Sequence, residues 1–114
     1  MTLTDHDIAC LEAAKELIDR DRQVHHSIEA IAHHAGMGRT RLKTCFKTHY
    51  GSGLYAYLRE QRLQYALQLL QNTQMPVKAV ARAAGYKQTS NFSYAFKKRF
   101  GMTAGERRNE GIKK

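Results

Sequence analysis

The chain has 114 residues, which is enough for one compact domain or two small lobes and too little for a catalytic cleft beside the core. Its two cysteines have no metal-binding or redox spacing, and it has neither a signal-peptide pattern nor a membrane-spanning apolar run, so we expect a cytoplasmic protein with buried, reduced thiols. The formal net charge of +9 favours a polyanionic partner.

Helical periodicity dominates the first half of the chain. Apolar spacing predicts three helices there, over 5–21, 28–35 and 39–49. Ser27 is a typical N-cap for the second of these helices. Gly36 and Gly51 are placed to end the second and third, because glycine adopts the left-handed conformation of a helix C-terminus.

The second half continues with helices. We expect them over 54–72, from 77 to the glycine at 85, over 89–99, and from a cap at Thr103 to about Asn109, followed by a frayed tail over 110–114. The long helix is predicted to have one apolar stripe, formed by Leu54, Leu58, Tyr65, Ala66, Leu69 and Leu70. Strand alternation is absent, so the sequence predicts an all-α fold of about seven helices.

One half of the sequence repeats the other. At an offset of 49 positions Ile28, Ile31, Ala32, Ala35 and Gly36 recur as Val77, Val80, Ala81, Ala84 and Gly85. At an offset of 50 Leu42, Phe46, Lys47, Tyr50 and Gly51 recur as Phe92, Phe96, Lys97, Phe100 and Gly101. A single inserted residue is tolerated in a turn but not inside a packed helix, so the change of offset indicates two helix–turn–helix units. We therefore predict subdomains over 5–52 and 76–109, joined by a linker helix over 54–72.

Charge is segregated along the sequence. Seven of ten acidic residues lie between Asp5 and Glu29, whereas between Ala30 and Gly105 twelve lysines and arginines accompany a single acid, Glu60. A general solubilising surface would mix both signs, so the pattern favours a nucleic-acid binder. The expected phosphate contacts are Arg39, Arg41, Lys47, Arg59, Arg62, Lys87, Lys97 and Lys98.

The second helix of each repeat is the one expected to enter DNA. Its inward face is fixed by Leu42 and Phe46 in one copy and by Phe92 and Phe96 in the other. Its other faces carry threonine, serine, asparagine and basic residues, which suit base edges and phosphates. A linker of about 19 residues spans roughly 28 Å. Successive major grooves on one side of DNA lie roughly 34 Å apart, and a bend in the DNA absorbs the difference, so a monomer would bind an asymmetric site with two unlike half-sites.

A family resemblance rests on both repeats. Gly85-Tyr86, Ser90-Asn91-Phe92-Ser93, Ala95-Phe96-Lys97-Lys98 and Phe100-Gly101-Met102-Thr103 resemble the signature of the AraC/XylS family of bacterial transcription regulators. Ile31-Ala32, Gly36-Met37, Leu42, Phe46-Lys47 and Gly51 resemble the first helix–turn–helix of that family's DNA-binding domain. The resemblance implies seven helices and binding to promoter DNA in two consecutive major grooves. It implies base contacts from Thr40, Lys43, Thr44, Thr89, Ser90, Asn91 and Tyr94.

The chain departs from the family pattern at a few positions. Ala104 stands where the family usually has proline, and Arg107 where it has an aromatic residue. Gly38 stands where a capping side chain is usual, so we expect the first recognition helix to be more mobile than the second. The family's ordinary members carry a sensor or dimerising domain ahead of this one.

Other groups of residues give weaker indications of function. His25-His26 and His33-His34 lack a cysteine or carboxylate at ligand spacing, so adventitious metal binding is the expectation. Tyr57 and Tyr65 suit core packing better than base stacking. A nucleophile–base pair, a phosphate-cradling glycine loop and a carboxylate dyad are all missing, so we expect neither an enzyme nor a cofactor.

Two rival functions use the same basic surface. An architectural DNA-binding protein or RNA chaperone would bind without sequence preference. A helical interaction module would instead dock an acidic partner such as RNA polymerase. The sequence does not indicate dimerisation, nor does it identify the target promoter.

Overall fold

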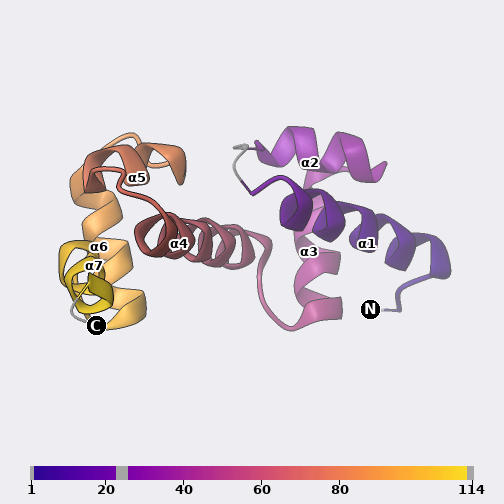
Figure 1. Cartoon of the computed structure of the whole chain (residues 1–114). Coiled ribbons are helices and arrows are strands. Elements are labelled where there is room, and N and C mark those ends of the chain that lie inside the picture. Colours follow the sequence, from indigo (N-terminus) through magenta and orange to yellow (C-terminus); the bar gives the residue numbers. More distant parts are fainter. Residues whose placement is uncertain (1, 23–25, 113–114) are drawn as a thin grey trace. The chain divides into compact units, whose positions relative to one another are not determined.

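A computed structural model describes residues 2–22 and 26–112, and over these residues it contains seven helices and no strand (Figure 1). The helices are α1 (Asp5–Arg20), α2 (Ile28–Ala35), α3 (Arg39–Tyr50), α4 (Leu54–Asn72), α5 (Val77–Ala83), α6 (Thr89–Phe100) and α7 (Ala104–Ile112). The all-α prediction is confirmed. The last helix is longer than expected, since it continues through part of the segment predicted to fray.

Side-chain caps begin three of the helices, as their sequences favour. Thr4 and Asp7 form a reciprocal capping box at the start of α1. The Ser27 hydroxyl accepts a hydrogen bond from the Ala30 amide at 3.1 Å at the start of α2. Thr103 caps α7 by accepting from the Glu106 amide at 3.1 Å, so the helix begins at Ala104 without the family's proline.

The two helices predicted to enter DNA, α3 and α6, begin alike. Gly38 precedes α3 and Gln88 precedes α6, and neither residue makes a side-chain capping hydrogen bond. The expectation of a more mobile α3 was based on a missing cap in the first unit alone. Because α6 lacks a side-chain cap too, the structure removes that difference.

The turns account for the change of offset between the repeats. Gly36, at φ 74°, ends α2 in the left-handed conformation, and Gly85, at φ 99°, occupies the corresponding place after α5. Two residues separate Gly36 from Arg39 at the start of α3, and three separate Gly85 from Thr89 at the start of α6. The inserted residue therefore lies in the second turn.

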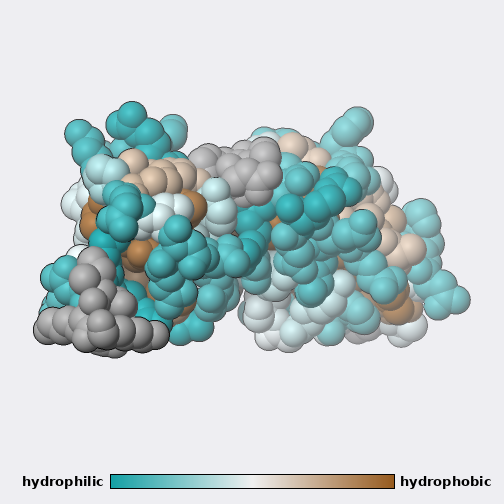
Figure 2. Space-filling view, in the orientation of Figure 1, coloured by the Kyte–Doolittle hydropathy of each residue, from teal (hydrophilic) through white to brown (hydrophobic). Residues whose placement is uncertain are grey.

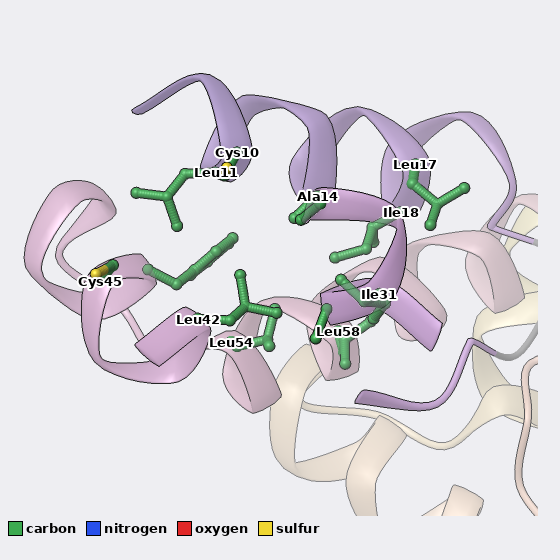
Figure 3. Packing of buried hydrophobic residues seen from close by; sticks show 13 residues of the cluster. Cys10, Leu11, Ala14, Leu17, Ile18, Ile31, Leu42, Cys45, Leu54 and Leu58 are labelled. Carbon is green, nitrogen blue, oxygen red and sulfur yellow. The ribbon is translucent and has the colours of Figure 1, made fainter. Parts of the chain in front are cut away.

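The chain divides into two compact units, residues 1–61 and 62–114. In the first unit, helices α1, α2 and α3 and the start of α4 enclose one apolar core (Figure 3). Its buried members are Cys10, Leu11, Ala14, Leu17, Ile18, Ile31, Ala32, Ala35, Leu42, Cys45, Phe46, Leu54 and Leu58. Both cysteines are free and buried here, as predicted.

The second unit has its own core. Its buried members are Leu63, Ala66, Leu70, Val80, Ala81, Ala84, Phe92, Phe96 and Ala104. The prediction of one apolar stripe on α4 was wrong in part, because Leu63 is buried while Tyr65 and Leu69 are only half-buried. α4 supplies residues to two separate cores, so no single period describes its buried positions.

Arg108 of α7 connects to the end of α4 and the segment after it. Its guanidinium donates hydrogen bonds to the carbonyl oxygens of Leu70 at 3.4 Å, of Thr73 at 3.3 Å and of Met75. Carbonyls at a helix C-terminus have no partner within the helix, and a guanidinium presents enough donors to satisfy several of them together.

We expect Arg108→Ala to destabilise the protein by about 1–3 kcal/mol, since it leaves these carbonyls without a charged donor. Arg108→Lys should recover only part of this loss, because an ammonium cannot reproduce the planar fork. Urea unfolding measures both, with Asn109→Ala at the neighbouring exposed position as the control. Equal stability of Arg108→Ala and Asn109→Ala would contradict the role assigned to the guanidinium.

The Asp7 carboxyl makes the free energy of unfolding depend on pH. The hydrogen bond from the Thr4 amide, and then that from Arg41, hold the pKa of its buried carboxyl below the usual value of 3.8. Because the folded pKa is depressed, this stabilisation is complete above pH 3.8 and is lost as pH falls through the folded pKa. We expect Asp7→Asn to reduce that loss, as measured by urea unfolding between pH 6 and pH 2, roughly the range in which carboxylates titrate. Asp5→Asn, at an exposed position of the same turn, is the matched control.

Candidate nucleic-acid interface

In the first unit, α3 has one buried side and one open side. Leu42, Cys45 and Phe46 are fully buried, which fixes the rotation of the helix about its axis. Thr40 and Thr44 are exposed and Lys43 is half-buried. The structure thus brings the three predicted base-contacting residues of this unit onto a single short helix, away from its core.

Two of the threonine hydroxyls of α3 donate hydrogen bonds to the backbone of the helix. The Thr44 hydroxyl donates to the Thr40 carbonyl oxygen at 3.1 Å, and the Thr48 hydroxyl donates to that of Thr44 at 3.0 Å. Thr44 retains its methyl group and the acceptor capacity of its oxygen. In DNA, those groups match the thymine methyl and an amino donor.

The second unit presents α6 in the same manner. Phe92 and Phe96 are fully buried, while Ser90, Asn91 and Tyr94 are exposed and Thr89 is half-buried. Tyr94 is 69% exposed, and the Lys98 ammonium lies 5.7 Å from the centroid of its ring. Every predicted base-contacting residue of this unit is therefore accessible on α6.

Most of the predicted phosphate contacts are open to solvent. Arg62 is half-buried, and the exposed positions are Arg39, Arg41, Lys47, Arg59, Lys87, Lys97 and Lys98. Polar residues also dominate the face of the molecule in Figure 2. The accessible cations are distributed over α3, α4, α6 and the turn before α6, so each unit has its own basic residues beside its recognition helix.

Two of these cations are paired with acids, which the sequence prediction did not include. Arg41 Nη2 lies 2.8 Å from Asp7 Oδ2, and Arg39 bonds the exposed Glu29. Asp7 is only 4% exposed and raises the pKa of Arg41 through that hydrogen bond. Both acids come from the acidic N-terminal segment, and this segregation of charge was the signal available in the sequence.

Sequence reasoning also missed Tyr55. This residue lies in the first turn of α4, is 57% exposed, and has the Lys43 ammonium 5.8 Å from its ring centroid. The sequence did contain a signal for this residue, because Tyr55 is aromatic and lies outside the apolar spacing of the long helix. Tyr55 therefore adjoins one of the predicted base-contacting residues.

The remaining candidate residues do not form a metal site within the described part of the chain. His33 and His34 are exposed, His25 lies outside the described residues, and within the described part no three histidine, cysteine or acidic side chains lie close enough to hold a metal. Tyr57 packs against the first core, and burial, with a hydrogen bond to Asp19, raises its pKa to about 12. None of the described helices is long and apolar enough to cross a membrane.

Comparison with known proteins supports the resemblance. A family model described as a helix-turn-helix domain matches residues 31–110. The virulence regulon transcriptional activator VirF of Yersinia enterocolitica is 37% identical over 81 residues, covering 71% of this chain and 30% of that protein. The chain thus spans about a third of that relative's length.

Solved structures agree with the fold. An AraC-type DNA-binding domain-containing regulator from Chromobacterium violaceum has a TM-score of 0.83 at 27% identity, over 96% of this chain and 98% of that one. The DNA-binding domain of AdpA, solved with a target DNA, has the same fold, with a TM-score of 0.80 at 22% identity over 88% and 90% of the two chains. The chain belongs to the AraC/XylS family of transcription regulators and carries the family's DNA-binding domain.

Proposed function

We propose that the chain binds one asymmetric promoter site as a monomer and inserts α3 and α6 into consecutive major grooves. The observation that carries the proposal is the arrangement repeated in both units. In each, two fully buried side chains, Leu42 and Phe46 or Phe92 and Phe96, fix a helix whose open side carries groove-reading residues. A helix held by its core presents those residues in a fixed register to the DNA.

The two open sides differ in chemistry, so the half-sites should differ in sequence. In α3, Lys43 can donate to guanine O6 and N7, and the Thr44 methyl can contact thymine. In α6, the exposed Asn91 amide can bond both N6 and N7 of adenine. Thr40 on one helix and Thr89, Ser90 and Tyr94 on the other complete the proposed base contacts.

Cations other than Arg39 and Arg41 should supply most of the salt dependence. Arg39 and Arg41 already form ion pairs with Glu29 and Asp7. These pairs lower the binding free energy that each arginine gains from a phosphate contact. The larger contribution then falls on Lys47, Arg59, Arg62, Lys87, Lys97 and Lys98. Each phosphate contact releases counterions, so each should add about one unit to the salt slope.

The length of α4 is compatible with consecutive grooves. Its 19 residues form one uninterrupted helix. At ~1.5 Å per residue this is roughly 28 Å, against roughly 34 Å between successive major grooves. A modest bend of the DNA would absorb the difference at a cost of a few kcal/mol.

Selection of bound duplexes from a random pool, at near-physiological salt, tests the proposal. We expect an asymmetric motif with two unlike half-sites about one helical turn apart. Salt-sensitive binding without any motif would instead identify an architectural nucleic-acid binder. A motif confined to one half-site would contradict the use of both recognition helices.

Asn91→Ala should relax base preference in one half-site only and weaken binding to the selected duplex by about 1–3 kcal/mol. The reason is the loss of a bidentate amide–adenine contact. Competition titrations against selected and scrambled duplexes measure the effect. The same substitution at the exposed Asn72 of α4 is the control. Equal losses on selected and scrambled DNA would remove Asn91 from the base-reading set.

A further inference from the structure

The packing of the first core does not explain why the Tyr55 side chain is exposed. Its helix neighbours Leu54 and Leu58 are buried in the first core, whereas 57% of Tyr55 remains open to solvent. Tyr55 and Tyr94 are the large hydrophobic residues that the described part of the chain leaves exposed. Tyr94 lies on α6, which we propose enters DNA, whereas Tyr55 lies on α4.

The ring of Tyr55 contacts the first recognition helix. The Lys43 ammonium lies over it, 5.8 Å from the centroid, within the range of a cation–π interaction. Both residues belong to the first unit. The second unit has a cation–π pair at other positions of the repeat, Lys98 over Tyr94 at 5.7 Å, and both of its residues lie within α6 itself. In the first unit the aromatic partner therefore comes from a different helix.

The surface around Tyr55 is suited to a polyanion. Arg59 follows four residues later on α4, so the two side chains share a face of the helix, and both are exposed. Lys43 adds a second cation from α3. An aromatic ring flanked by two cations matches a nucleic-acid surface better than an apolar protein partner.

We propose that Tyr55 is a positioning residue for base reading by Lys43. A lysine side chain has a flexible four-carbon stem, so its ammonium samples many positions unless something holds it. The Tyr55 ring attracts the ammonium and limits those positions while leaving its donors free for a guanine edge. The inference rests on the proposed function, because it assigns how one of its base contacts is oriented.

Substitutions at Tyr55 separate the ring from the hydroxyl. Tyr55→Phe keeps the aromatic face and should bind the selected duplex as the unsubstituted chain does. Tyr55→Ala should weaken binding about two- to fivefold and relax the preference at one base of one half-site. Because Tyr55 is exposed, we expect unchanged thermal unfolding in both variants, which is measured alongside.

A double-mutant cycle supplies the decisive readout. In a Lys43→Ala background, Tyr55→Ala should have no further effect on affinity or base preference, since the group it orients is gone. Tyr94→Ala removes the other exposed ring, which is a proposed base contact of the other half-site; it should alter the preference there and leave the base affected by Lys43→Ala unaltered.

Each other outcome overturns the inference in a distinguishable way. Equal losses from Tyr55→Phe and Tyr55→Ala would assign the contact to the hydroxyl. An undiminished effect of Tyr55→Ala without Lys43 would make Tyr55 an independent DNA contact. No effect of Tyr55→Ala, with preference lost in Lys43→Ala, would reject the positioning role and retain the proposed function. Failure to select any motif would reject both.

Discussion

Burial of the apolar residues of α4 is the constraint on which both units depend. A helix–turn–helix pair is too small to close a core by itself. Leu54 and Leu58 complete the first core, and Leu63, Ala66 and Leu70 complete the second. Once these cores are closed, the inward sides of α3 and α6 are fixed, and so is the direction of their open sides. The orientation of the proposed interface is therefore fixed mainly by the packing of core residues outside it.

Electrostatics distinguishes the two recognition helices. The acidic α1 supplies the buried Asp7, which both caps its own helix and holds Arg41 of α3. This contact joins α1 to α3 and involves one of the arginines that we propose as phosphate contacts. In α6 the last turn is basic, with Lys97, Lys98 and Arg99. The Arg41 guanidinium thus serves the packing of the first unit as well as the proposed phosphate contact.

Features with a local cause could be predicted from the sequence, and those that depend on packing could not. Periodicity, caps such as Ser27 and the glycine at 36 act within a few residues, so the helices and the turns were predictable. Burial on α4 was mispredicted because two cores compete for its positions, and Leu63 satisfies the second. The Asp7–Arg41 pair spans 34 positions of sequence, and the Arg108 hydrogen bonds span up to 38. Five of the seven proposed base contacts are exposed, and Lys43 and Thr89 are half-buried. The Lys43–Tyr55 pair joins two helices, so it could not be predicted from the sequence of α3 alone.

The two repeats distinguish the buried residues that stabilise the fold from the exposed residues that we propose contact DNA. Leu42 and Phe46 correspond to Phe92 and Phe96, all fully buried, so the scaffold is kept apolar in both copies. Substitution of exposed residues away from caps and ion pairs costs little stability. The open sides of α3 and α6 can therefore differ while the cores stay closed, and two unlike half-sites become compatible with one duplicated fold. Under this division, Tyr55 belongs with the residues of the proposed interface, because its ring is not a member of either core.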